Sequence, residues 1–180
     1  MSNGTRLAAA GSLYARLGMD LAPFVFELPS TYLAHVDILT SLGMKDSPTY
    51  ESMQALLFQL QKSCGYQRLN PNELRAVLRI LHFICDKTNR ANSSVNHVIP
   101  DPAKDAVVPD NSGRLLQATA CVYADSAGAS LVGKIDSSRV RFVHPHVPEQ
   151  LCAELGVRKL SEVIVEVNVI FIITAVFVLI

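Results

Sequence analysis

The sequence lacks an excess of charge of either sign. Its 180 residues contain 16 Lys and Arg against 16 Asp and Glu, so the formal net charge at pH 7 is zero. Residues 1–90 carry nine basic and seven acidic residues, and residues 91–180 carry seven and nine. Domains that hold nucleic acid by bulk charge are strongly basic. We therefore expect no nucleic acid among the partners.

Cysteine is scarce, with only Cys64, Cys85, Cys121 and Cys152. No C-x-x-C pair occurs, which argues against a structural zinc site or a thioredoxin motif. Four cysteines are also too few for a disulfide-dense secreted scaffold. We expect reduced thiols packed as small apolar side chains, as in a cytoplasmic protein. Residues 1–13 lack the continuous apolar run of a secretory signal.

Motifs that hold phosphate or metal are missing as well. The sequence has neither G-x-x-x-x-G-K-[ST] nor G-x-G-x-x-G, and the stretch 125–134 has its glycines at the wrong spacing. His144 and His146 are separated by Pro145, which favours an extended step that turns the two rings to opposite sides. With no third ligand nearby, we expect no metal site there.

Candidate catalytic residues lack a supporting signature. His35 and His82 lie inside expected helices, where packing is the commoner role. A nucleophilic pair of Cys85 or Cys152 with one of the five histidines has no local motif in its favour. We therefore predict no enzyme: no catalytic residue, no cofactor-binding residue and no metal ligand.

Apolar residues make up 49% of the chain, enough for a hydrophobic core. Their spacing predicts an α+β fold whose N-terminal half contains three helices, at about 32–42, 48–64 and 71–88. The first has apolar residues at helical spacing, followed by Gly43 and Met44 as a C-terminal stop. This stripe consists of Leu33, Val36, Leu39 and Leu42.

Capping residues mark the start of the next two helices. Ser47 is the expected N-cap of the second, with Pro48 in its first turn. Asn70 is the expected N-cap of the third, and Glu73 completes a capping box. The apolar stripe of the second helix is Met53, Leu56, Leu57, Leu60 and Cys64. The third helix has an expected buried face of Leu74, Val77, Leu78, Leu81 and Cys85, widened by Ile80, Phe83 and Ile84.

The third helix is also somewhat basic. We interpret its basic residues as a solvated face, with partner binding as the alternative. These residues are Arg68, Arg75, Arg79, Lys87 and Arg90.

The second half of the chain is expected to contain short strands and one short helix. Residues 91–112 are polar and rich in proline, which predicts a linker between a helical segment at 1–90 and a small α/β segment at 113–162. Residues 110–113 form an expected turn, 114–124 and 140–143 expected strands, and 147–155 an expected helix. Leu-Gly followed by Met or Val occurs at 17–19, 42–44 and 155–157, which we interpret as one helix stop used three times.

An apolar tail occupies residues 163–180. Eleven of the twelve residues from Val169 to Ile180 are apolar. Twelve helical residues span ~18 Å against a hydrocarbon core of ~30 Å, and extension back to Val163 adds Glu166 and Asn168 to the span. Three readings stay open: a membrane segment, a buried strand, or a sequence foreign to the native domain.

Three segments, the third in two parts, occur in a fixed order that resembles one family. S-L-G-M-K-D-S-P-T-Y-E-S-M-Q-A-L-L-F-Q-L (41–60) and N-P-N-E-L-R-A-V-L-R-I-L-H-F-I-C-D (70–86) are helical. V-P-D-N-S-G-R-L-L-Q-A-T-A-C-V-Y-A-D (108–125) precedes R-F-V-H-P-H-V-P-E-Q-L-C-A-E-L-G-V-R-K-L (141–160). This order resembles the repeat region of sacsin-type giant proteins, above all those of plants, over roughly residues 11–163.

The resemblance implies a cytoplasmic co-chaperone scaffold. The family's leading ATPase part, which resembles that of Hsp90, has no counterpart in this chain, so no nucleotide-binding residue is carried over. The implied role is that of a fragment: a non-catalytic interaction segment that contacts other modules of such a protein or the Hsp70 system. The alternative is a tail-anchored membrane protein with a small cytosolic domain, inserted through residues 163–180.

Overall fold

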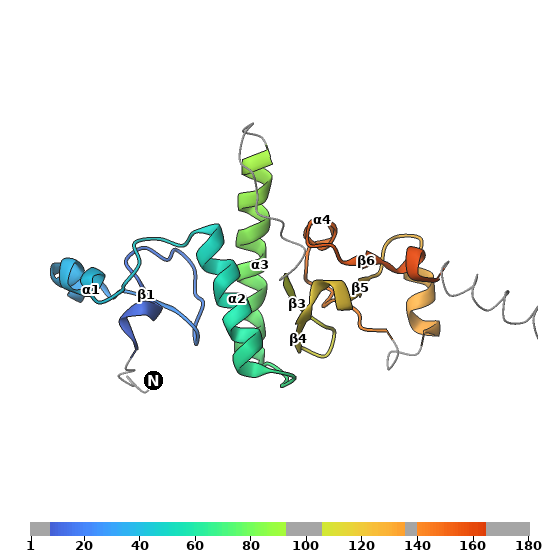
Figure 1. Cartoon of the computed structure of the whole chain (residues 1–180), viewed down its shortest axis with the longest axis horizontal. Helices are drawn as coiled ribbons and strands as arrows, with labels where there is room; N and C mark the ends of the chain where they lie inside the picture. The colour runs from blue at the N-terminus through green and yellow to red at the C-terminus, as the bar shows by residue number, and fades with distance from the viewer. Residues whose placement is uncertain (1–7, 93–105, 136–139, 165–180) are drawn as a thin grey trace, which may run out of the picture.

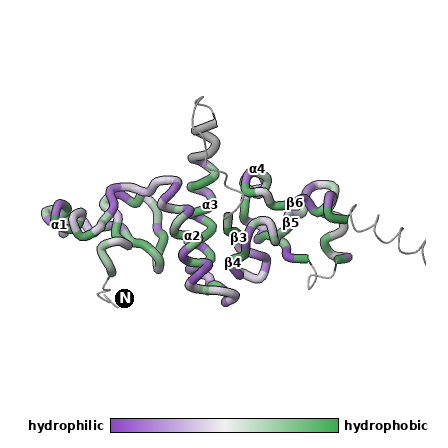
Figure 2. The backbone as a smooth tube through the Cα atoms, viewed as in Figure 1, coloured by the Kyte–Doolittle hydropathy of each residue, from purple (hydrophilic) through white to green (hydrophobic). Residues whose placement is uncertain are grey.

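The chain forms an α+β fold with two long helices between two regions of short strands (Figure 1). A computed structural model describes residues 8–92, 106–135 and 140–164. Along the helix pair, the tube of Figure 2 changes repeatedly between hydrophilic and hydrophobic residues, as in amphipathic helices. The predicted tail from residue 165 onward lies outside the described residues.

The N-terminal region combines one strand pair with a helical arm. The 3-10 turn η1 (Ala10–Ser12) leads into β1 (Leu13–Tyr14), which pairs in parallel with β2 (Phe26–Glu27). The chain then forms the 3-10 helix η2 (Ser30–His35) and the short α-helix α1 (Val36–Ser41).

The first predicted helix is present, but it differs in form from a continuous α-helix. It begins as a 3-10 helix, only six residues are α-helical, and no residue of η2 or α1, all of them described, is buried. Two residues of its apolar stripe, Leu33 and Leu42, are 54% and 66% exposed. The predicted stop is confirmed. The Gly43 N–H donates to the Thr40 carbonyl and the Met44 N–H to that of Leu39, and Gly43 has φ of 102°.

Helices α2 (Tyr50–Cys64) and α3 (Pro71–Asn92) pack against each other. The predicted Ser47 cap is wrong, because the Thr49 side chain accepts from the Ser52 N–H while the Ser52 hydroxyl accepts from the Thr49 N–H. This capping box starts α2 two residues later than expected. The Asn70 cap is confirmed: its Oδ1 accepts from the N–H groups of Asn72 and Glu73.

The predicted linker contains a core strand. Strand β3 (Val107–Pro109) pairs antiparallel with β4 (Leu115–Gln117), with Val107 opposite Gln117 and Pro109 opposite Leu115. Its three residues are buried, because the apolar V-V-P run packs against α2 and completes the core. Residues 93–105 of the expected linker lie outside the described chain. The predicted turn at 110–113 is confirmed, since the Gly113 N–H donates to the Asp110 carbonyl.

One main core includes buried residues from both long helices and from the segments after them. Met53 and Leu57 of α2 and Val77, Ile80 and Leu81 of α3 are at most 3% exposed. The same cluster extends into the later segments through Val108, Leu115, Leu151 and Leu155. The hydrophobic effect therefore joins the helical region to the strands that follow it.

The C-terminal region consists of short elements. After β4 come η3 (Ala118–Ala120), β5 (Val122–Tyr123), η4 (Ala129–Lys134), α4 (Glu149–Glu154) and β6 (Arg158–Lys159), which pairs in parallel with β5. The expected strand at 140–143 is reduced to isolated bridges of Phe142 with Val122 and Val143 with Asp110. A second, smaller cluster of Val122, Phe142 and Leu160 also receives Val163 and Ile164.

The Leu-Gly motif stops two helices, not three. Gly156 ends α4 as Gly43 ends α1: its N–H donates to the Ala153 carbonyl and the Val157 N–H to that of Cys152. Gly18 also has a positive φ, of 68°, but it follows strand β1. The same three letters thus mark a left-handed backbone position in each case and a helix end in only two.

Candidate functional site

One hollow of the described chain gathers several residues that the sequence singled out. It has a volume of about 730 Å3 and lies among α3, β5 and the segment leading into α4. His82, His144, His146 and Cys152 all line it, together with Tyr123. We call it the histidine hollow. Its further lining residues are Asn111, Ala124, Val132, Phe142, Val143, Pro145, Val147, Pro148 and Glu149.

The two imidazoles of His144 and His146 lie side by side, so the expectation that they turn to opposite sides is wrong. Their ring centroids are 5.1 Å apart in an edge-to-face arrangement. The His146 backbone N–H donates to Nδ1 of His144 at 3.2 Å, which holds the tight local turn. Burial, together with the neighbouring His146, lowers the pKa of His144. In the described part of the chain no three metal-ligating side chains come together.

The thiol in the histidine hollow is not activated. Cys152 is 1% exposed, and burial with the nearby Glu149 charge raises its pKa to about 11. Burial and Asp110 raise the pKa of Cys121 to about 12. A nucleophilic cysteine needs the thiolate near neutral pH, so these pKa values give no support to Cys152 as the nucleophile of a Cys–His pair.

Segments that carry the family resemblance bind one another. The loop after β3 is closed by Asp110, which is 0% exposed and whose Oδ1 accepts from the N–H groups of Ser112 and Arg114 and from the Ser112 hydroxyl. The Asn111 N–H donates to the Phe142 carbonyl, and the His144 N–H to that of Pro109. The P-D-N-S-G-R-L and F-V-H-P segments are thus joined by their backbones.

In the glycine-containing stretch 125–134, the Asp125 carboxylate accepts hydrogen bonds from within the stretch and from Ser161. Asp125 accepts from the Ser161 hydroxyl at 2.8 Å, from the Ser161 N–H at 3.2 Å and from the Gly128 N–H at 3.3 Å. The Ser161 bonds are the main cause of the lowered pKa of Asp125. A Cβ on Gly128 would lie 2.8 Å from Leu160 Cβ, so this glycine serves close packing. The stretch offers no open cradle for phosphate.

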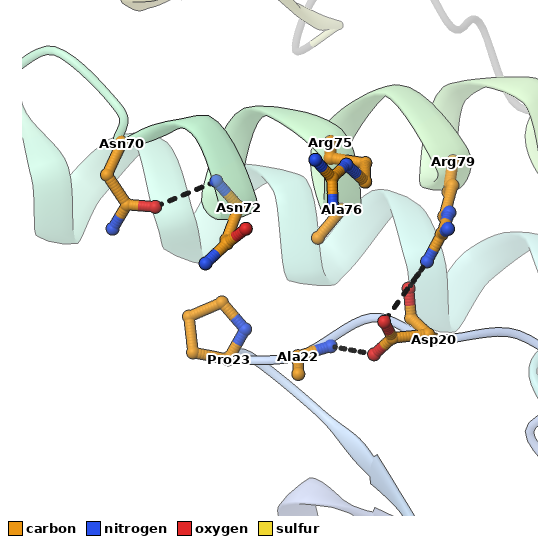
Figure 3. Close-up of a pocket in the computed structure, with 8 residues that line it drawn as sticks. All are labelled: Asp20, Ala22, Pro23, Asn70, Asn72, Arg75, Ala76 and Arg79. Carbon is orange, nitrogen blue, oxygen red and sulfur yellow. Dashed lines mark hydrogen bonds and ion pairs between the residues drawn. The ribbon is translucent and has the colours of Figure 1, made fainter. Parts of the chain in front are cut away.

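A second hollow, which we call the notch, lies between α3 and the loop at residues 20–23 (Figure 3). It has a volume of about 400 Å3. Arg79 reaches across it: its Nη1 lies 2.6 Å from the Asp20 carbonyl oxygen and 3.3 Å from Asp20 Oδ2. The notch is lined by Asp20, Ala22, Pro23, Asn70, Asn72, Arg75, Ala76 and Arg79.

Arg68, Arg75 and Arg79 are exposed, as predicted for a solvated face, and two of them also have specific partners. Arg68 donates from Nε to the Ser112 carbonyl and so ties the α2–α3 turn to the β3–β4 loop. Arg79 pairs with Asp20, and Arg75 lines the notch. The side chains of Lys87 and Arg90 lie outside the described part. The sequence identified these arginines as basic residues of the helix but could not predict their partners, Ser112 and Asp20, which are distant along the chain.

A third surface is the helical arm formed by η2 and α1 (residues 30–42 with the cap residue). Four of its large apolar side chains are more than half exposed: Tyr32, Leu33, Ile38 and Leu42. Figure 1 shows the arm at one end of the molecule, beyond the helix pair. It presents an apolar surface without a covering element.

Comparison with protein-family models, with curated proteins and with solved structures finds no match to this chain. Among the described residues no helix has both the length and the apolarity needed to cross a membrane.

Proposed function

We propose that the chain is a non-catalytic structural and interaction segment of a sacsin-like co-chaperone scaffold in the cytoplasm. Its partners are other modules of such a protein or the Hsp70 chaperone system, and the arm is the surface that binds them. The family assignment is supported by the order of the sequence segments described above.

The observation that carries this proposal is the exposure of the arm. Twelve consecutive residues, 30–41, form helical structure without burying one side chain. Ile38 and Leu42 are 61% and 66% exposed. Short helices are marginal in water, and contiguous exposed apolar surface marks sites of association. Docking of a partner would remove this surface from water and stabilise the arm.

The histidine hollow supports a non-catalytic role. A catalytic site needs a nucleophile or an acid–base pair with a suitably tuned pKa. Here the only thiol of the hollow is buried and protonated near neutral pH, and an imidazole nitrogen of His144 is already used by the His146 backbone. The family-like segments around the hollow hold the fold together.

Binding to purified candidate partners tests the proposal. The full chain is immobilised and exposed to a sacsin-type ATPase-like module and to an Hsp70. We expect saturable binding to at least one of them, lost in the Ile38→Ser/Leu42→Ser double variant. Tyr66→Ser is the matched control, because Tyr66 is 84% exposed but lies in the α2–α3 turn, outside the arm. Binding that is absent, or equal in the double variant, or turnover of ATP by the chain, rejects the proposal.

The second candidate is a tail-anchored membrane protein, favoured by the apolar residues at 169–180. Arg158 and Lys159, both exposed, would flank the segment on the cytosolic side. Carbonate extraction of membranes distinguishes the two candidates. An anchored protein remains in the pellet as the full chain and is released when the chain ends at Ser161; release of both forms removes this candidate.

A further inference from the structure

We infer that the notch binds a carboxylate side chain from an acidic peptide segment of a partner protein. The notch lies on a different surface from the arm. This inference does not depend on membership of the sacsin family, because binding of an acidic peptide to the chain can be measured directly.

The two walls of the notch have distinct chemistry. Asn72, Arg75 and Arg79 stand on one side of α3, and Asp20 and Pro23 face them from the loop (Figure 3). Ala76, which is 1% exposed, lies between the arginines and leaves room where a larger side chain would fill the space. Guanidinium and amide groups therefore surround a recess with a small apolar floor.

The charges of the notch do not balance. Asp20 is engaged twice, since its Oδ2 pairs with Arg79 and its Oδ1 accepts from the Ala22 N–H at 3.1 Å. No acidic side chain of the described chain forms an ion pair with Arg75. Two arginines against one aspartate leave a net charge of +1 in the notch. Among the described residues, none therefore occupies the donors of the Arg75 guanidinium, which can bind an anion.

The site depends on side chains, not on the N-terminus of α3. The N–H groups of Asn72 and Glu73 are already taken by Asn70 Oδ1. The planar fork of a guanidinium matches a carboxylate in a bidentate fashion. The Pro23 ring and the Ala76 methyl group can contact the methylenes of a glutamate while its carboxylate meets Arg75.

An acidic peptide fits the site better than nucleic acid does. Nucleic-acid binding draws on many phosphate contacts, whereas the notch offers a net charge of +1 on a chain with no net charge. A volume of about 400 Å3 is in the range of small recognition sites, with room for one or two side chains.

Fluorescence anisotropy of a short labelled peptide that alternates Glu and Gly tests the inference, with a Gln–Gly peptide as the neutral probe and the full chain as receptor. We expect saturable binding of the acidic peptide alone, weakened by added salt. Arg75→Gln should weaken it about two- to five-fold, as expected for an exposed ion pair. Arg16→Gln is the matched control, because Arg16 is an exposed arginine that pairs with Asp46 outside the notch.

Asp20→Asn separates binding from a merely structural role. It removes the carboxylate that competes for Arg79 and raises the net charge of the notch, so we expect tighter peptide binding. A structural role alone would make both the Asp20 and the Arg75 variants weaker in proportion to their loss of melting temperature. The inference is overturned if both variants weaken binding in proportion to their loss of melting temperature. It is also overturned if the neutral peptide binds equally, if no saturable binding is seen, or if Arg75→Gln binds the peptide as the Arg16→Gln control does.

Discussion

At the scale of single residues, Gly128 has less room for an added Cβ than Gly11, Gly18, Gly43, Gly65 or Gly113. An added Cβ would meet Asp125 Oδ1 at 2.7 Å and Leu160 Cβ at 2.8 Å. We expect Gly128→Ala to destabilise the fold by about 1–3 kcal/mol, the usual cost of overpacking. Gly11→Ala is the control, because nothing lies within 4 Å of its Cβ position. Equal melting temperatures for the two variants, measured by circular dichroism, would contradict the close packing at Gly128.

Asp125 should make stability depend on pH in a defined direction. Its pKa in the folded chain is below the ordinary value of 3.8, chiefly because of the Ser161 bonds, so the carboxylate form favours folding. This contribution is fully present above the ordinary pKa and is lost as the pH falls through the lower folded pKa. In urea unfolding, Asp125→Asn should therefore lower the midpoint at neutral pH and lose most of this effect well below pH 3.8.

The control for Asp125 is Asp46→Asn, which removes an exposed carboxylate that pairs with Arg16. We expect a small effect of this variant throughout the pH range. An Asp125 variant whose midpoint deficit stays constant from neutral to acidic pH would show that the Ser161 bonds do not depend on the charge.

Asp110 shows what the sequence could and could not predict at this scale. The D-N-S-G letters predicted a turn, which the structure has. Nothing in them predicted that Asp110 is 0% exposed or that the adjoining segment bonds to Phe142 and His144. Those contacts join residues more than thirty positions apart, which local propensity does not encode.

At the scale of elements, the start of α2 provides a direct test. The Thr49–Ser52 capping box implies that Thr49→Ala costs about 1 kcal/mol, whereas Ser47→Ala should be nearly neutral. Chemical denaturation of the two variants measures the difference. A larger loss at Ser47 would place the helix start where the sequence pattern predicted it.

The three expected helices show where apolar periodicity succeeds and where it fails. It located α2 and α3, because their stripes meet each other and the strands; Val77 and Ile80 are 0% exposed. The same periodicity in residues 33–42 occurs in a helical segment that buries none of its residues. Periodicity reports that a segment can bury one face, while burial itself needs a second surface, which the arm lacks within the described chain.

At the scale of the whole molecule, the arm and the core should respond differently to substitution. Ile38→Ser/Leu42→Ser changes side chains that are more than 60% exposed, so unfolding free energy should fall by less than about 0.5 kcal/mol per site. Ile80→Ala, at a position 0% exposed, should cost about 2–5 kcal/mol. Urea denaturation compares them, and a cost of several kcal/mol in the arm variant would show that the arm belongs to the core.

Residues 107–109 of the predicted linker form a strand, and the physical reason lies in the core around them. The prolines and polar residues of 91–112 predicted a loop, so the short V-V-P strand was not recognised. This strand is buried in a core formed by residues from both the predicted helical segment (1–90) and the predicted α/β segment (113–162). A three-residue strand gains its stability from the core around it, so its own composition carries little signal. The fold class, by contrast, follows from the two long amphipathic helices and the short apolar runs after them, and it is confirmed.

The central claim is that the arm is an interface for a partner protein. Photo-crosslinking in cells tests it most directly, with a photoreactive residue placed at Ile38 and, as control, at Tyr66, which is also exposed. The account predicts that position 38 is joined to a sacsin-type module or an Hsp70, and that the Tyr66 site is not. Equal crosslinking at both positions, or none at position 38, would contradict it.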